Sequence, residues 1–198
     1  TTSAGTTSAI SYAQYSTAAT IATAITTAAS GIGVTATATN TTTLASLGAA
    51  GTVTFTLFGG ANSTVQGAAV SAVIADQNDL SNLVSAINGV QGTTGISAAF
   101  TTTGSKASIT LSTTDGRNIG IDTFANNTAG NDTVVFGGST LTEGAAATIN
   151  AVVTGTISLS STQGPIATAN AGADVFASAG VNNSSFLSVA ALSLSTAN

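Results

Sequence analysis

The segment Leu83–Phe100, LVSAINGVQGTTGISAAF, is the most structured part of a chain that is otherwise rich in Thr, Ala, Ser and Gly. Together with the residues just before it, it predicts a short helix. The apolar residues recur at the i, i+3, i+4, i+7 spacing of one helical face: Leu80, Leu83, Val84 and Ile87. Asp79 is the predicted N-cap of this helix, and the pair Asn88-Gly89 is its predicted C-terminal stop.

A β-hairpin is predicted directly after this helix. Residues 96–101 have the pattern of a strand, TTGSK has the composition of a turn, and Ala107–Ser112 is the returning strand, with Ile109 and Leu111 facing inward. Asp115-Gly116 then predicts a second turn, which leads into an apolar alternation through Ile121. The segment contains no reactive side chain, so we expect it to determine shape.

An internal duplication is predicted, because part of this pattern occurs earlier in the chain. A shift of 62 positions places Ala24-Ile25 on Ala86-Ile87, Gly33-Val34 on Gly95-Ile96, and Thr35-Ala36 on Ser97-Ala98 without a gap. The two predicted units cover about residues 17–58 and 79–122. Each is expected to contain a helix, a glycine turn and a hairpin, and the hairpin of the earlier unit would pair Val34–Thr39 with Thr52–Phe58.

The rest of the chain predicts further strands. After Phe124 the candidates are Asp132–Phe136, Ala147–Ser160 and Asp174–Ser178, with the single Pro165 as a break. The expected fold class is therefore α+β and predominantly β. Short helices would pack on hairpins and sheets, in one domain or two small lobes.

The composition excludes several classes of function. The chain has 2 Lys+Arg and no His, Cys, Met or Trp, so no disulfide can form and the usual zinc ligands and thiol nucleophile are missing. Two basic residues cannot follow a phosphate backbone, which argues against nucleic-acid binding. No window of 18 strongly apolar residues predicts a membrane span. We expect no enzyme activity and no cofactor.

The sequence contains three weaker candidates for chemistry. Asp115 and Asp122 flank Arg117, a pattern more typical of turn residues with one ion pair than of a carboxylate pair. ADQND (residues 75–79) lacks the Gly and the distal Glu of an EF-hand loop, so no metal site is predicted. The Tyr and Phe residues are expected in the core, and Tyr12 with Tyr15 is the only candidate for a sugar-stacking pair. Six Asn-x-Ser/Thr sequons are typical of so Thr-rich a chain.

The order of helix, SAIN, TGI, Ser-Ala and a hairpin ending in ITLSTTDGRNIGI resembles the IN motif of the outer region of bacterial flagellins. The motif covers Asp79 to Ile121, and its matching residues are Asp79, Leu83, Ala86, Ile87, Asn88, Gly95, Ile96, Ala98, Ile109, Leu111, Asp115 and Gly116. The earlier copy departs from the motif, with Thr26 in place of Asn and a longer hairpin loop. FLSVAALSLSTAN (residues 186–198) resembles the lead-in to the C-terminal helical core of flagellins.

This resemblance implies a structural, extracellular role in the bacterial flagellum. Residues 1–16 would be an entry segment, 17–185 the surface-exposed outer region (β-rich over 124–185), and 186–198 the start of a helical core that this sequence lacks. The implied partners are other flagellin subunits in a homopolymer assembled through that core, and exposed Ser and Thr would offer glycan acceptors. The alternative is an adhesin, surface-layer or carbohydrate-binding module, which would need a groove lined by exposed aromatic residues.

Overall fold

The computed structural model describes residues 2, 4–13, 16–128, 130, 132–145, 149–167 and 181–182. Its contacts divide the chain into two compact units. Unit 1 consists of Thr1–Ser11, Ala24–Ala36 and Leu159–Asn198, and unit 2 of Tyr12–Thr23 and Thr37–Ser158. The described residues form an α+β fold that is predominantly β, which confirms the expected fold class.

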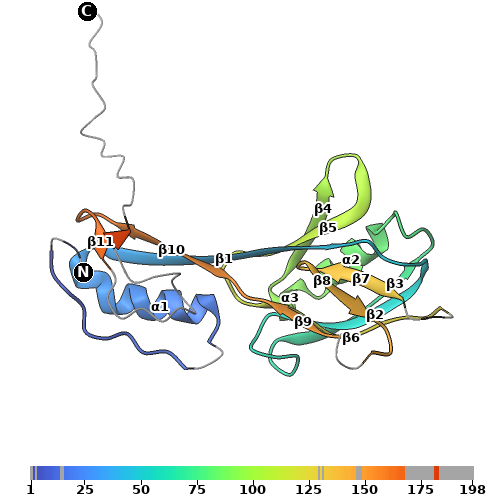
Figure 1. The fold of residues 1–198 in the computed structure, drawn as a ribbon, viewed down its shortest axis with the longest axis horizontal. Helices are drawn as coiled ribbons and strands as arrows, with labels where there is room; N and C mark the ends of the chain where they lie inside the picture. The colour runs from blue at the N-terminus through green and yellow to red at the C-terminus, as the bar shows by residue number, and fades with distance from the viewer. Residues whose placement is uncertain are drawn as a thin grey trace, which may run out of the picture. The chain divides into compact units, whose positions relative to one another are not determined.

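Unit 2 contains two antiparallel sheets (Figure 1). The first has the order β4-β5-β1-β7-β8, and β10 also pairs with β1; its strands are β1 (Val34–Ala45), β4 (Ser97–Thr102), β5 (Ser105–Thr113), β7 (Thr133–Phe136), β8 (Ser139–Thr142) and β10 (Thr156–Ser161). The second has the order β3-β2-β6-β9, with β2 (Gly51–Phe58), β3 (Gly67–Ile74), β6 (Ile119–Asn126) and β9 (Ala151–Val153).

The core of unit 2 lies between these sheets. β2 alternates as predicted, and its inward residues Val53, Phe55 and Leu57 are buried together with Ile121 of β6 and Phe136 of β7. Helix α2 (Ser81–Gly89) packs against β3 of one sheet and β4 of the other. Its buried residues complete the same cluster, so one helix face and two sheet faces share a single hydrophobic core.

Strand β1 shows why a Thr-rich sequence forms a regular strand here. Its inward side chains are buried or half-buried, and its outward positions are exposed threonines: Thr35, Thr37, Thr39, Thr41 and Thr43. Thr is β-branched and fits a pleated, half-buried surface. The alternation therefore extends the predicted strand at residues 34–39 to Ala45.

Unit 1 is built on the end of a helix and the start of a strand. Helix α1 (Ala18–Ala29) continues into the 3-10 helix η1 (Ser30–Ile32), and Val34 opens β1. The small core of unit 1 contains Ala29, Val34 and Ile166, with Ile32 and Leu159 packed against it. The paired strands β11 (Ile166–Ala167) and β12 (Val181–Asn182) also belong to this unit.

Three expected elements differ from the structure or lie outside its described residues. The predicted pairing of residues 34–39 with 52–58 is wrong, because β2 pairs with β3 and β6 in the other sheet. Ala147–Ser160 contains two described strands, β9 and β10, in place of one. The candidate strand at residues 174–178 and the lead-in segment 186–198 lie outside the described residues.

Candidate functional site

The candidate site is the predicted unit of helix, glycine turn and hairpin. Asn88 is the residue that connects its helix to its first strand. The side chain leaves the last turn of α2 and binds the backbone of Ala98 in β4 twice. Asn88 Nδ2 donates to the carbonyl of Ala98 at 3.0 Å, and the N–H of Ala98 donates to Asn88 Oδ1 at 2.8 Å. The amide acts like one residue of a neighbouring strand, so it fixes the helix end on the outer edge of β4.

Gly95 makes the turn between helix and strand. The predicted stop at Asn88-Gly89 does end α2, but a second short helix, α3 (Gln91–Thr94), follows after Val90. The left-handed residue that ends the helical segment is Gly95, with φ 70° and ψ 12°. A Cβ at Gly95 would also meet the guanidinium of Arg117, so the backbone angle favours glycine here and any larger residue would have to displace the Arg117 side chain.

Asp115 and Gly116 form the turn after β5. Asp115 Oδ1 accepts the N–H of Arg117 at 3.2 Å, and Gly116 has φ 71° and lies so close to Ala38 of β1 that a side chain would not fit. Arg117 pairs with Asp115 at 2.6 Å and donates through Nη1 to the carbonyl of Thr94 at 3.2 Å. Hydrogen bonds from the Arg117 side chain lower the pKa of Asp115, and the same pairing raises the pKa of Arg117.

The apolar motif residues lie in the core of unit 2, as predicted. Those that are fully buried are Leu83, Ile87, Ile96, Ile109 and Leu111. Ala86 is partly buried and packs against the same cluster. β4 and β5 form the predicted hairpin, with Ala98 opposite Leu111 and Ser97 opposite Ser112.

Asp79 is not the N-cap; that position belongs to Leu80, whose carbonyl accepts the N–H of Val84. The N–H of Leu80 is held by the carbonyl of Lys106, and this places the helix start one residue later than the sequence predicts. Asp79 Oδ1 still accepts from the N–H and hydroxyl of Ser81, and Oδ2 pairs with Lys106 at 3.0 Å. Hydrogen bonding from Ser81, and then from Lys106, lowers the pKa of Asp79 to about 2.

The predicted earlier copy has the same local structure. Thr26 is the residue equivalent to Asn88, and its hydroxyl takes the role that the Asn88 amide has in the second copy. Thr26 Oγ1 donates to the carbonyl of Ala36 at 3.1 Å, and the N–H of Ala36 donates to the same oxygen at 2.8 Å. Gly33 is left-handed, with φ 69° and ψ 26°, as Gly95 is. The departure from the motif, Thr for Asn, therefore preserves the contact that the motif residue makes.

The hairpin of the earlier copy is closed by β10, which lies far along the chain. Thr35 contacts Ser160 through the two hydroxyls at 2.7 Å, as Ser97 contacts Ser112 at 3.1 Å. Nearer the turn, Thr156 contacts the carbonyl of Thr39, and the equivalent residues of the second copy, Thr101 and Ser108, are also hydrogen-bonded. Residues 40–155 are thus inserted between the two strands of the first hairpin, at the position that residues 102–107 occupy in the second.

A sequence signal for this distant strand exists, but it does not follow the shift of 62 positions that relates the helices. SITLSTTDG (residues 108–116) corresponds to TISLSSTQG (residues 156–164), and the final glycines of both have positive φ, 71° at Gly116 and 92° at Gly164. The helix and first strand of the two copies are related by one shift in residue number, and the second strands by another. The shifts differ because the first copy is interrupted by an insertion between its strands.

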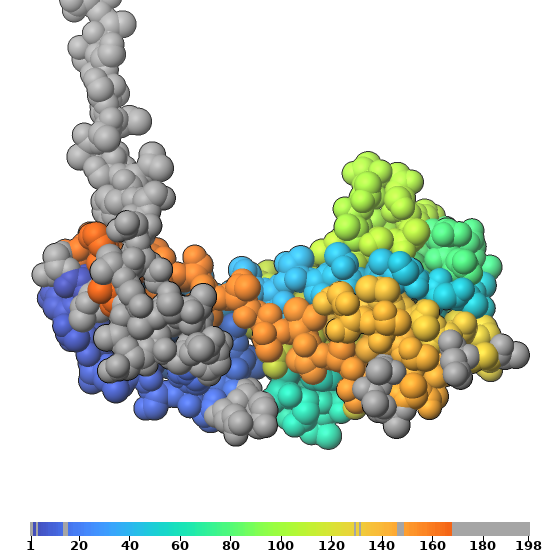
Figure 2. Space-filling view, in the orientation of Figure 1, coloured from blue at the N-terminus to red at the C-terminus, as the bar shows by residue number. Residues whose placement is uncertain are grey.

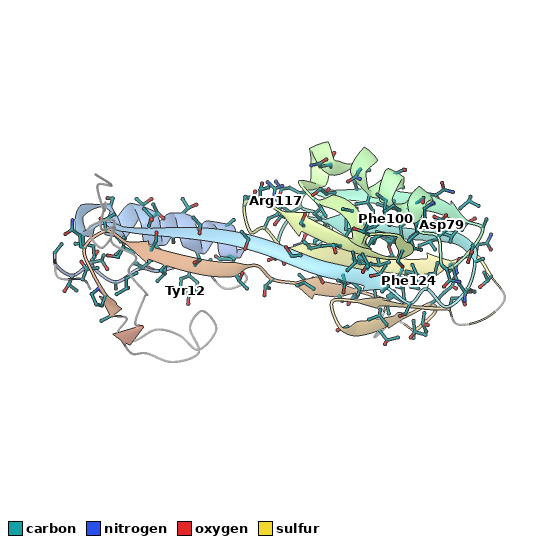
Figure 3. All side chains as sticks on the ribbon, turned by 90° about the horizontal axis from the view of Figure 1, so that it is seen from above. Tyr12, Asp79, Phe100, Arg117 and Phe124 are labelled. Carbon is teal, nitrogen blue, oxygen red and sulfur yellow. The ribbon has the colours of Figure 1, made fainter. Side chains whose placement is uncertain are left out.

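The weaker candidates do not come together as a reaction site. Asp122 lies within β6 opposite Thr56, and Asp115 is in the turn with Arg117. Figure 3 shows that Asp79 and Arg117 also lie well apart. In ADQND, Asp76 binds the N–H and side chain of Asn78 within a turn. Among the described residues there is no group of three or more acidic, His or Cys side chains able to hold a metal ion.

The aromatic residues are only partly as expected. Phe55, Phe58, Phe124 and Phe136 are buried, whereas Phe100 is 38% exposed. Phe100 lies on the β4–β5 hairpin, whose tip projects from the rest of unit 2 (Figure 1), so the expectation of a core position is wrong for this residue. Tyr12 is half-buried, and its predicted companion Tyr15 lies outside the described residues.

Comparison with models of known protein families gives no match, and no curated protein sequence is significantly similar to the chain. Within the described residues, no helix has the length and apolar character needed to cross a membrane.

Proposed function

We propose that the chain is a structural protein, the surface-exposed outer region of a flagellin-type subunit of a bacterial flagellar filament. The observation that carries this proposal is the helix, glycine and hairpin unit of Asp79–Ile121, in which every motif residue has a structural task. Asn88 holds β4, Gly95 makes the turn and the apolar residues form the core. The parallel use of Thr26 and Gly33 supports a duplicated unit of the same kind.

The surface of the chain supports a hydrated, exterior position. The outward side of β1 presents exposed threonine hydroxyls and no charge, and the chain as a whole has 9 charged residues, 2 basic and 7 acidic. A neutral hydroxyl surface with a mild negative net charge is well solvated and is not attracted to anionic cell envelopes. In this proposal the filament contacts belong to other segments of the subunit, and the residues described here form its outer surface.

The first test is the association state of the 198-residue chain. We expect a monomer by sedimentation, and no filaments by negative-stain microscopy, because the longest described helix, α1, runs only from Ala18 to Ala29 and is too short for a long apolar seam. Filaments formed by this chain alone would contradict the proposal.

The second test uses a flagellin-type subunit that carries this sequence as its outer region. Deleting residues 12–183 and joining the ends should still permit export and filament assembly, with altered bundling or surface recognition. A deleted subunit that is secreted normally but never forms filaments would show that this region makes obligatory contacts. Saturable binding of the intact chain to a glycan array would instead favour the carbohydrate-binding alternative.

A further inference from the structure

The sequence has six Asn-x-Ser/Thr sequons, and the structure distinguishes the three whose asparagine side chains it describes. The side chains of three, Asn40, Asn62 and Asn126, are described. An asparagine accepts a glycan through its side-chain amide nitrogen, so an acceptor must be exposed, and its nitrogen must not be engaged in the fold. Burial and hydrogen bonding therefore decide which of the three can be modified in the folded chain.

Two of the three are structural. Asn40 is 4% exposed, and its Nδ2 donates to the carbonyls of Arg117 at 3.0 Å and Val153 at 2.8 Å. Asn126 is fully buried, and its Nδ2 donates to the carbonyl of Ala49 at 3.0 Å and to the carboxylate of Asp132 at 3.1 Å. Both amides join strands and loops of unit 2, so a transferase cannot reach either nitrogen without unfolding the chain.

Asn62 has the opposite environment. It is exposed in the loop between β2 and β3, a segment closed by a hydrogen bond from the N–H of Gly59 to the carbonyl of Gln66. This loop forms the turquoise projection at the lower edge of unit 2 in Figure 2. No described residue accepts a hydrogen bond from Asn62 Nδ2. Asn62 is exposed, and its amide nitrogen is therefore not engaged by the part of the chain that the structure describes.

The other sequon residue is already in contact with the amide of Asn62. Asn62 Oδ1 accepts from the N–H of Thr64 at 3.1 Å and from the hydroxyl of Thr64 at 2.6 Å. These bonds engage the oxygen and leave the nitrogen as the open side of the amide. The hydroxyl on which sequon recognition depends is thereby presented beside the acceptor, on the same exposed turn.

We propose that Asn62 is an acceptor for an N-linked sugar, delivered by a transferase that uses a sugar activated as its diphosphate ester. A bond forms between Asn62 Nδ2 and the anomeric carbon, and the bond from that carbon to the diphosphate oxygen breaks, with its electron pair leaving on the diphosphate. The amide nitrogen gives up one proton to a base of the transferase. This proposal does not depend on the filament role, because it requires only the exposed loop.

The test incubates the folded chain with a soluble asparagine N-glycosyltransferase and UDP-hexose, followed by intact-mass measurement and peptide mapping. We expect one hexose on the Asn62 peptide and none on the peptides of Asn40 or Asn126. Asn62→Gln and Thr64→Ala should abolish the adduct, whereas Thr64→Ser, which keeps a sequon hydroxyl, should retain it. A thermal melt of each variant shows that the adduct is not lost through unfolding.

A sequon in an unstructured tag on the same chain is the positive control for the transferase. The proposal is overturned if the tag is modified and Asn62 is not, or if Asn40 and Asn126 in the folded chain are modified as fast as Asn62. Modification of Asn40 and Asn126 only after denaturation would support the selection of Asn62 by the fold.

Discussion

Asn88 is the residue through which the motif holds helix and strand together, and the equivalent Thr26 predicts how it can be replaced. Asn88→Ala removes both bonds to Ala98 and should lower the free energy of unfolding by about 1–2 kcal/mol. Asn88→Thr places a hydroxyl where the first copy has one and should recover part of this loss. Urea denaturation of the chain measures both.

Asn82→Ala is the matched control, because it removes a single exposed bond to the carbonyl of Val73. If Asn88→Ala is no more destabilising than Asn82→Ala, the bonds of Asn88 are not what holds β4.

Substitution of Gly95 tests whether this position requires a residue that readily adopts the left-handed backbone conformation. Gly95→Ala should cost about 1–2 kcal/mol from the backbone angle alone, and more if the guanidinium of Arg117 cannot move aside. Gly92 in α3 has open space around it and no positive φ, so Gly92→Ala should be neutral or slightly stabilising. Thermal melts of both variants check the contrast, and equal effects would refute it.

The ionised Asp79 side chain is expected to contribute to the free energy of unfolding in a way that depends on pH in the acid range. Its folded pKa of about 2 lies below the ordinary value of 3.8, so the stability gained from its ionised form is complete above about pH 4 and is lost as the pH falls toward 2. The urea midpoint of wild type should exceed that of Asp79→Ala at pH 7, and the gap should narrow near pH 2. Comparing the two proteins at each pH cancels the titration of the other carboxylates, and a constant gap would contradict the assignment.

At the scale of elements, helix α2 is held by its buried face. Ile87 is fully buried between the sheets, so Ile87→Asp places an unpaired carboxyl in the core and should cost about 3 kcal/mol or more. Ser85 is exposed on the same helix, and Ser85→Asp should change the melting temperature little. A melting temperature for Ile87→Asp within a degree of wild type would show that this face is not the buried one.

The elements that could be predicted from the sequence are those whose decisive contacts are local. The spacing of Leu83 and Ile87 defines α2, and the turn at Gly104 joins β4 directly to β5. β3 was not predicted, because GAAVSAVI contains three Ala residues and becomes a strand by pairing with β2. The N-cap was misplaced by one residue because the carbonyl of Lys106, distant in sequence, fixes Leu80.

For the whole molecule, the main failure of prediction was the partner of β1. The contact between Thr35 and Ser160 joins residues separated by the entire inserted segment, and its sequence signal is the distant similarity of residues 156–164 to residues 108–116. The candidate site was predicted better, because its buried residues and its glycine lie within one continuous stretch. The role of Thr26 became visible only when its bonds to Ala36 could be compared with those of Asn88.

Unit 2 is predicted to fold by itself. Every residue of its core cluster lies between Leu44 and Val153, inside the continuous segment Thr37–Ser158. A chain limited to residues 37–158 should therefore show a single cooperative thermal transition by circular dichroism, with dispersed amide signals by NMR. A broad transition without dispersed signals would show that residues outside this segment are needed for the core.

The interrupted hairpin of β1 and β10 also imposes an order on events during synthesis. Thr35 leaves the ribosome long before Ser160, so the first hairpin cannot close until nearly the whole inserted segment has been translated. Closing so long a loop of unfolded chain carries a large entropic cost. Once the insert has folded, Thr39 and Thr156 lie within hydrogen-bond distance, and most of that cost has been met. Unit 2 should thus fold first, and β10 should then pair with β1. Slow translation late in the message would delay only this pairing.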